Sequence, residues 1–283
     1  MKMVHQPLPK PIPQLYTELG EYLYLLLDGS QIESLEDKLK QLPFTVEYEV
    51  IYNRKPWSVL REVTPIIAKC DLELAKWFLT TCGCNQGYFV TSKKALPILI
   101  ENYQSLIEVK SPYDSVVLFK IAHSEAAWIL YDDENSIIWN DIESVWIPTR
   151  EGWKNKKRPS YFKDISDKSI FQLTNEHWYA LGEVSWRNTL CSIKRHMEKW
   201  FQHQLPSDQD LWIQVHANRA YSLGFQSERD LLLFFTVIGY LSDNVLINNL
   251  YLDIRELIEK PSRETPSQRI EKAALLAEKY ANQ

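Results

Sequence analysis

The chain has 283 residues and a formal net charge of −5 at pH 7. An acidic chain lacks the broad basic surface that neutralises phosphates, so these totals argue against a nucleic-acid-binding protein. The length exceeds the usual size of one hydrophobic core, which predicts two compact lobes.

The N-terminus and the cysteines indicate the compartment. No stretch approaches the roughly 18–20 apolar residues of a membrane span, and the proline-rich first 13 residues lack the apolar core of a signal peptide. Cys82 and Cys84 form a C-x-C pair with no histidine at ligand spacing, so no metal site is predicted. Four cysteines without a disulfide pattern fit a reducing interior. We therefore expect a soluble cytoplasmic protein with no cofactor, no metal ion and no membrane insertion.

The first element is an apolar run at residues 22–27, which an Asp-Gly turn cuts off. Six apolar residues between turn residues are typical of a strand that is buried on both faces. Ser30 and Glu33 have the spacing of a capping box, which predicts a helix that begins there and ends before Pro43.

The rest of the first lobe mixes strand and helix patterns. Residues 45–52 alternate apolar and polar, which indicates a half-exposed strand near a sheet edge, and residues 59–68 form a further apolar stretch. A short helix is expected over residues 72–80. Residues 87–121 then show a strand, a helix and a strand, an order that predicts a crossover and some parallel pairing. The last strand is expected at residues 145–147.

Residues 150–168 change character, because basic side chains gather there with few aliphatic ones. This composition is typical of a solvated connection between domains, and the alternative is a contact with nucleic acid or anionic lipid. The basic residues are Arg150, Lys154, Lys156, Lys157, Arg158 and Lys163.

After residue 168 the pattern is helical almost throughout. Thr174, Ser227 and Thr265 are candidate N-caps, and Gly224 stands where a helix should end. Residues 231–241 are apolar nearly all round, which is typical of a buried central helix. These patterns predict a bundle of about four or five helices.

The predicted fold is an α/β N-terminal lobe, with a mixed sheet and flanking helices, followed by an all-α C-terminal helical lobe. The lobes are expected at residues 1–149 and 169–283, joined by the basic linker 150–168.

No catalytic motif stands out in the sequence, which has no nucleophile elbow and no phosphate loop. A catalytic Cys84–His123 pair stays open, because a nucleophile and its base need only meet in space, against the commoner alternative of a packed cysteine and a surface histidine. Asp28 follows the first strand, where α/β enzymes often place a functional carboxylate. The turn chemistry of Asp28, Gly29 and Ser30 explains the same residues without catalysis.

Several stretches together resemble a known family. They are Tyr24-Leu25-Leu26-Leu27-Asp28-Gly29, then Trp77-Phe78-Leu79 leading to Gly87-Tyr88-Phe89-Val90-Thr91-Ser92, then Leu96 to Leu106 and Val116 to Ile121, and late in the chain Ala217 to Phe225 and Glu228 to Leu231. On these residues the chain is similar to the bacterial type VI secretion adaptors, or effector chaperones, first catalogued as a domain of unknown function. The order of the elements matches over nearly the whole chain. Two places depart from the family pattern: Cys84 to Gly87, where many members have Trp-Gly, and Ala122 to Glu125, where many have Asp-Pro-Arg.

The resemblance implies a role without catalysis. Such adaptors bind a toxic effector protein in the producing cell and help to load it onto the secretion spike, a VgrG-type trimer with a PAAR-type tip. The resemblance also implies a short helix at residues 125–131, where side-chain propensities favour a strand. The alternative function is a small hydrolase or transferase that uses the Cys84–His123 pair or Asp28.

An adaptor needs an exposed apolar surface with aromatic anchors and a polar rim. The best candidates are aromatic residues near the predicted boundary, because few of their sequence neighbours can cover them. The alternative is that they pack the two lobes together. The five candidates are Trp139, Trp146, Trp153, Tyr161 and Phe162.

Overall fold

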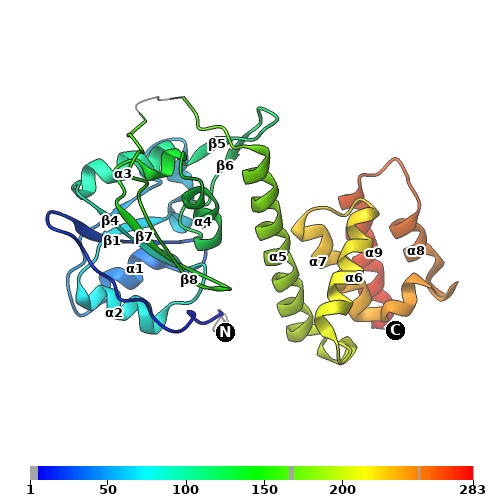
Figure 1. Ribbon diagram of the computed structural model, residues 1–283. Helices are drawn as coiled ribbons and strands as arrows, with labels where there is room; N and C mark the ends of the chain where they lie inside the picture. Colours follow the sequence, from blue (N-terminus) through cyan, green and yellow to red (C-terminus); the bar gives the residue numbers. More distant parts are fainter. Residues whose placement is uncertain (1–5, 166–168, 248, 283) are drawn as a thin grey trace. The chain divides into compact units, whose positions relative to one another are not determined.

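The computed structural model of the chain describes residues 6–165, 169–247 and 249–282. The chain forms two compact units, Met1–Gly182 and Glu183–Gln283 (Figure 1). The expected fold class is confirmed, because an α/β unit precedes a helical one. The division falls within helix α5 (Asn175–Trp200), C-terminal to the linker expected at residues 150–168.

The N-terminal unit is built on a sheet whose described strands follow the order β2-β3-β1-β4-β7-β8. The strand predicted at residues 22–27 is β1 (Tyr22–Leu27), which lies between β3 (Ile66–Lys69) and β4 (Gly87–Ser92). Each of the pairings in this sheet is antiparallel. The other strands are β2 (Tyr48–Val50), β7 (Ser144–Thr149) and β8 (Gly152–Lys157).

The parallel crossover expected at residues 87–121 is wrong. Helix α3 (Leu96–Ser105) leads from β4 to a separate hairpin, in which β5 (Glu108–Lys110) and β6 (Val116–Leu118) pair antiparallel with each other. An apolar run indicates a strand but does not specify its partner, so the sequence pattern alone could not distinguish the two arrangements.

Part of the expected linker is a strand of the sheet. β8 follows β7 through a tight turn, and Thr149 pairs with Gly152 while Ser144 pairs with Lys157. β8 is an edge strand, and lysines on an edge discourage pairing with another chain. The basic composition therefore marks a solvated sheet edge at residues 152–157, and a linker is the wrong description of them.

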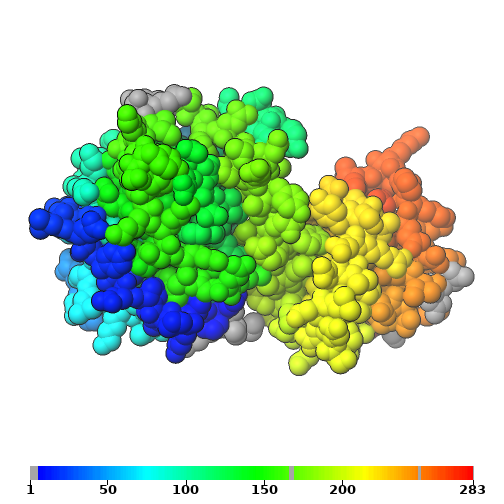
Figure 2. Space-filling view, in the orientation of Figure 1, coloured from blue at the N-terminus to red at the C-terminus, as the bar shows by residue number. Residues whose placement is uncertain are grey.

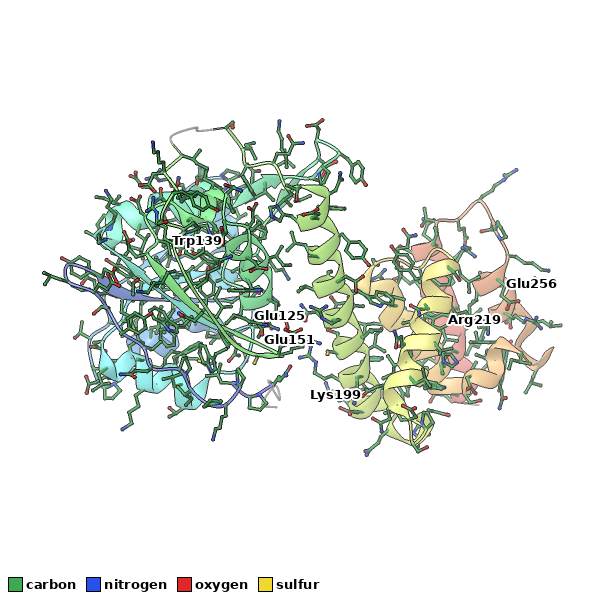
Figure 3. All side chains as sticks on the ribbon, viewed as in Figure 1. Glu125, Trp139, Glu151, Lys199, Arg219 and Glu256 are labelled. Atoms are coloured by element: carbon green, nitrogen blue, oxygen red, sulfur yellow. The ribbon has the colours of Figure 1, made fainter. Side chains whose placement is uncertain are left out.

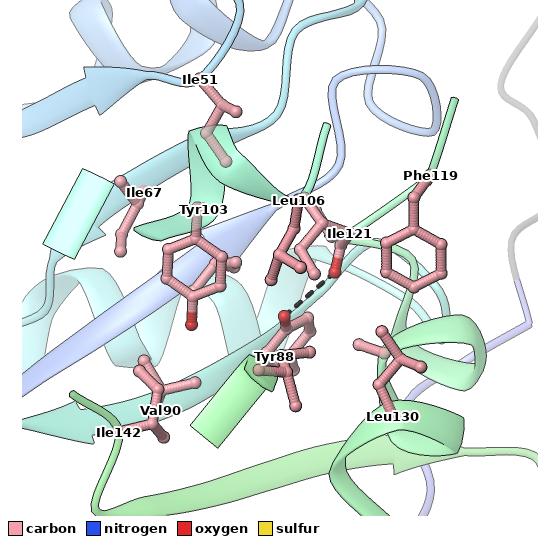
Figure 4. Close-up of a cluster of buried hydrophobic side chains, with 14 of the residues drawn as sticks. Ile51, Ile67, Tyr88, Val90, Tyr103, Leu106, Phe119, Ile121, Leu130 and Ile142 are labelled. Atoms are coloured by element: carbon pink, nitrogen blue, oxygen red, sulfur yellow. Dashed lines mark hydrogen bonds between the residues drawn. The ribbon is translucent and has the colours of Figure 1, made fainter. Parts of the chain in front are cut away.

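Side chains of β1 alternate between two apolar layers, as strand geometry requires. Tyr24 and Leu26 join the layer that contains residues of α3 and α4, and Leu25 and Leu27 join the layer that contains residues of α1 and α2. Figure 4 shows part of the first layer, where the Tyr88 hydroxyl donates a hydrogen bond of 3.0 Å to the Ile121 carbonyl. The helices are α1 (Leu35–Lys40), α2 (Leu72–Thr81) and α4 (Ser124–Asp132). Helix α4 confirms the helix that the resemblance implied.

The helix after β1 begins later than the sequence predicted. The expected capping box of Ser30 and Glu33 is wrong, because α1 begins at Leu35 and its N-cap residue Ser34 forms no side-chain capping hydrogen bond in the structure. The Ser30 hydroxyl donates instead to the carboxylate of Asp28. The segment between β1 and α1 is therefore an extended turn.

The C-terminal unit is the expected helical bundle. Ser227 accepts the Asp230 amide as N-cap of α7, and Thr265 forms a full capping box with Gln268. In the described part of the chain every helix is too short or too polar to cross a membrane. The helices after α5 are α6 (Gln209–Ser222), α7 (Glu228–Leu241), α8 (Leu252–Glu259) and α9 (Pro266–Ala281).

Helix α7 is the buried central helix that the sequence predicted. Phe234 and Phe235 are completely buried there, and Gly239 lies against the ring of Phe201, where an added Cβ would clash. Gly224 has a φ of 96° just after α6, as expected for a residue that ends a helix.

Candidate functional site

Two of the five predicted aromatic anchors lie in the hydrophobic core. Trp139 is completely buried inside the N-terminal unit (Figure 3), its ring lies 4.9 Å from that of Tyr131, and its Nε1 donates to the Asp133 carbonyl at 3.2 Å. Trp146 is buried in the middle of β7 and meets Tyr16 edge-on at 5.1 Å. Neither ring is accessible to a partner, so their assignment as anchors is wrong.

Trp153 holds the N-terminal segment against the sheet. Its ring stacks on Phe89 with centroids 6.3 Å apart, and its Nε1 donates to the Pro9 carbonyl at 2.9 Å. Figure 2 shows the N-terminal residues, in blue, lying along the green surface that includes β7 and β8. The half-buried Trp153 is thus occupied within its own unit.

The last two candidates differ from each other in exposure. Phe162 packs against the core beneath the guanidinium of Arg158. Tyr161 is well exposed, and its hydroxyl donates to a carboxylate oxygen of Glu134. Among the five, Tyr161 is the residue whose side chain a partner can reach.

The basic residues at 150–158 each lie beside a carboxylate. The pairs are Arg150–Glu125, Lys154–Glu151, Lys156–Asp132, Lys157–Glu18 and Arg158–Asp164. Matched charges leave little positive potential for phosphates. The segment therefore lends no support to a nucleic-acid site.

Burial also dominates the environment of Cys84 and His123. The Cys84 thiol donates to the Pro7 carbonyl at 3.2 Å, and burial raises its pKa. Burial lowers the pKa of His123 to about 4, and its Nδ1 accepts the Ala126 amide at 3.4 Å as the cap of α4. A nucleophilic cysteine needs a lowered pKa, so this environment favours two neutral packed groups. No cluster of His, Cys, Asp or Glu in the described residues could hold a metal ion.

The turn after β1 buries a carboxylate. Asp28 is 3% exposed, and its Oδ1 accepts hydrogen bonds from the amide and the hydroxyl of Ser30 at 2.8 and 2.7 Å. This confirms the turn chemistry expected from the sequence. Oδ2 is buried and has no hydrogen-bond partner in the structure, which is costly for a charged oxygen. Burial accordingly raises the pKa of Asp28, although the bonds from Ser30 oppose this.

Gly29 brings this turn against the chain that enters β3. A Cβ on Gly29 would lie 2.1 Å from the carbonyl oxygen of Thr64, so any larger residue would push the two segments apart. The Thr64 hydroxyl in turn accepts the Tyr52 amide at 2.9 Å. The close approach places the 3₁₀ helix η1 (Trp57–Val63) beside the turn.

A groove with a volume of about 980 Å³ lies between residues 29–37 and 58–66. Its one guanidinium, on Arg61, is already bound to Glu36 at 3.1 Å. Among the described residues, the exposed carboxylates of Glu33, Asp37 and Glu62 form no ion pair, so the groove presents net negative charge. Its charged lining residues are Glu33, Glu36, Asp37, Arg61 and Glu62.

A cavity of about 90 Å³ adjoins the groove, and the two share Ser30 and Val63. Asp28 lies in the cavity wall together with Tyr52 and Lys120. Burial raises the pKa of Tyr52 to about 12, so its hydroxyl stays neutral. The rest of the wall is apolar and consists of Leu60, Val63, Pro65, Leu118 and Ala122.

Exposed apolar side chains surround these openings. Val59 is 85% exposed, and Val63 and Leu118 are also exposed. Exposed apolar side chains beside a concave surface offer area that a bound partner would remove from water. We call the groove, the Asp28 cavity and the rim residues Val59, Val63 and Leu118 the acidic groove site. Its chemistry suits binding of a polypeptide that is basic and partly apolar.

Comparison with known proteins identifies the family. The family described as "Domain of unknown function (DUF4123)" matches residues 23–136. The chain is also 38% identical to "Accessory protein VasW" of Vibrio cholerae over 273 residues, which cover 95% of this chain and 92% of the relative. The chain belongs to the DUF4123 family. No solved structure matches it.

Membership of DUF4123 confirms the resemblance to type VI secretion adaptors and supports an accessory role in type VI secretion. The whole acidic groove site falls inside the DUF4123 segment, because its lining residues run from Asp28 to Ala122. The five aromatic candidates all lie beyond residue 136. The sequence signal that did point to this site was the Asp-Gly turn at the end of β1.

Proposed function

We propose that this DUF4123 protein is a type VI secretion adaptor, which binds a toxic effector protein in the cytoplasm and helps to load it onto the secretion spike. The spike component that receives the cargo is a VgrG-type protein or its PAAR-type tip. The observation that carries the proposal is the acidic groove site, an accessible concave surface with an apolar rim. The name of the relative, an accessory protein, supports the same role.

The two parts of the site supply different contributions to binding. The rim side chains Val59, Val63 and Leu118 offer apolar area, which stabilises a complex by about 25 cal/mol per Å² removed from water. The groove carboxylates attract a basic segment and reject an acidic one, so they contribute association rate and selectivity. An adaptor has to select one cargo among many cytoplasmic proteins, and this combination does so without any reaction.

The direct test is capture of cargo. The toxin encoded beside the gene for this chain is co-expressed with it, and the complex is isolated and its dissociation constant measured. We expect a stable complex with that toxin and none with an unrelated toxin of similar size. Failure of the chain to bind any neighbouring toxin would overturn the proposal.

A matched pair of substitutions locates the binding surface. Val59→Lys is expected to weaken effector binding by about tenfold or more, since it replaces an apolar rim contact with a charge that repels a basic segment. Leu72→Lys is the control, because Leu72 is 84% exposed, against 85% for Val59, and does not line the groove. Both variants should have the same melting temperature as the wild type, since neither side chain is packed against the core. Equal affinities for the two variants would contradict binding at the acidic groove site.

A further inference from the structure

We infer that the Asp28 cavity binds the ammonium group of a lysine side chain from the bound effector, so that this lysine fixes the position of the effector in the groove. The inference rests on the proposed function and adds to it the chemistry of the docking residue.

The argument begins with the unused acceptor. Oδ1 of Asp28 accepts both hydrogen bonds from Ser30. Oδ2 has no hydrogen-bond partner in the structure, although Asp28 is only 3% exposed. A buried carboxylate is ordinarily paired with a cation or with several donors. Asp28 lines a cavity, and Oδ2 itself is closed off from solvent, so a donor that enters the cavity completes its coordination by displacing the wall beside Oδ2.

The shape of the site selects lysine over arginine. A guanidinium presents a planar fork that is best matched by two acceptor oxygens, whereas an ammonium is a compact point charge that one oxygen can bind. Only Oδ2 is free here. The cavity of about 90 Å³ is lined by Leu60, Pro65 and Leu118 among its apolar residues, and such walls suit the aliphatic stem of a lysine.

The surroundings of the cavity favour a cation as well. The adjoining groove carries the carboxylates of Glu33, Asp37 and Glu62 without an internal ion pair among the described residues. Lys120 of the chain itself lies in the cavity wall, and its positive charge opposes the rise in the pKa of Asp28, although the structure shows no ion pair between the two residues. Lys120 is exposed, so it competes with an incoming lysine without filling the cavity.

The test uses n-butylammonium as a probe for the lysine side chain, propylguanidinium for arginine and n-butanol as the neutral control. Binding to the full chain is followed at about pH 8, well above the ordinary aspartate pKa, because burial raises the pKa of Asp28. The signal is the NMR resonance of the Ser30 amide, which donates to Asp28. We expect a saturable shift with n-butylammonium at a dissociation constant of about 1–10 mM. Propylguanidinium should bind more weakly and n-butanol should leave the signal unchanged.

Three variants make the test specific. Asp28→Asn keeps an acceptor for Ser30 but loses the charge, and it should weaken n-butylammonium binding by about tenfold or more. Glu73→Gln removes an exposed carboxylate on α2 that lines neither the groove nor the cavity, and it should bind the probe as well as the wild type. Lys120→Ala removes the competing cation and should bind it more tightly. A shift that n-butanol reproduces, a shift that persists in Asp28→Asn, or no shift at all would overturn the inference.

The effector separates this inference from the proposed function. Asp28→Asn should also weaken effector binding. Replacement of the effector lysine that enters the cavity by norleucine should weaken binding to the wild-type chain but should not weaken binding to Asp28→Asn any further. Normal effector binding by Asp28→Asn would reject the lysine pocket while leaving the adaptor role intact. Absence of effector binding by the wild-type chain would reject the adaptor role, whether or not the chain binds n-butylammonium or propylguanidinium.

Discussion

Replacement of Trp139 by alanine is expected to lower the free energy of unfolding of the N-terminal unit by about 3–5 kcal/mol. The indole is completely buried, packs edge-on against Tyr131 and donates a hydrogen bond to the Asp133 carbonyl. Alanine would leave a cavity and remove one of two donors to the Asp133 carbonyl, which also accepts the Ser136 amide. Urea denaturation of the full chain, followed by circular dichroism, measures the loss.

Trp200→Ala is the matched control for this loss. Trp200 is 60% exposed on α5 and belongs to the C-terminal unit, so its removal should leave the unfolding of the N-terminal unit unchanged and alter that of its own unit by less than about 0.5 kcal/mol. A small effect of Trp139→Ala on unfolding, combined with a loss of effector binding, would restore Trp139 as a partner anchor and contradict its position in the core.

Gly29→Ala is expected to destabilise the N-terminal unit by about 1–3 kcal/mol and to weaken effector binding as well. The new Cβ would lie 2.1 Å from the Thr64 carbonyl oxygen, which is backbone and cannot rotate away. The turn and the segment that follows η1 would separate, which would change the groove between them. Thermal and urea denaturation measure the first effect, and effector affinity measures the second.

Gly182→Ala serves as the control, because it is expected to raise the free energy of unfolding, whereas Gly29→Ala lowers it. Gly182 lies in helix α5 with no atom within 4 Å of an added Cβ, so alanine should stabilise by about 0.5–1 kcal/mol. If Gly29→Ala were as well tolerated as Gly182→Ala, the turn would have room to move, and the close packing that forms one wall of the groove would be contradicted.

Elements that depend on local chemistry could be predicted from the sequence. The apolar run of β1 became the central strand because its side chains fill both layers of the core. The caps at Ser227 and Thr265 formed because each side chain satisfies an amide within three residues along the chain. The turn at Asp28 followed the same rule.

Features that depend on distant segments could not be predicted. Trp139 and Trp146 lack obvious cover among their sequence neighbours, but Tyr131 and Tyr16 pack on them in the fold. Whether β6 joins the main sheet or a separate hairpin is likewise decided by tertiary packing. Residue type alone therefore predicted exposed aromatic anchors at Trp139 and Trp146, two positions that lie in the hydrophobic core of the folded unit.

The candidate site could not be predicted from the sequence for the same reason. Glu33 and Glu62 belong to segments separated by a helix and a strand, and both line the groove because Gly29 lets the turn approach Thr64. Val59 belongs to an apolar stretch that continues into the buried strand β3, yet it is itself exposed. The sequence could identify Asp28 and its turn, but the groove exists only in the folded unit.

Amide hydrogen–deuterium exchange of the chain with and without its bound effector tests the central claim most directly, since it maps the contact surface on the intact complex. Binding at the acidic groove site should protect the exchanging amides of residues 28–37 and 57–64 and slow exchange in β6. Protection confined to residues 183–282, with these three segments unchanged, would contradict it.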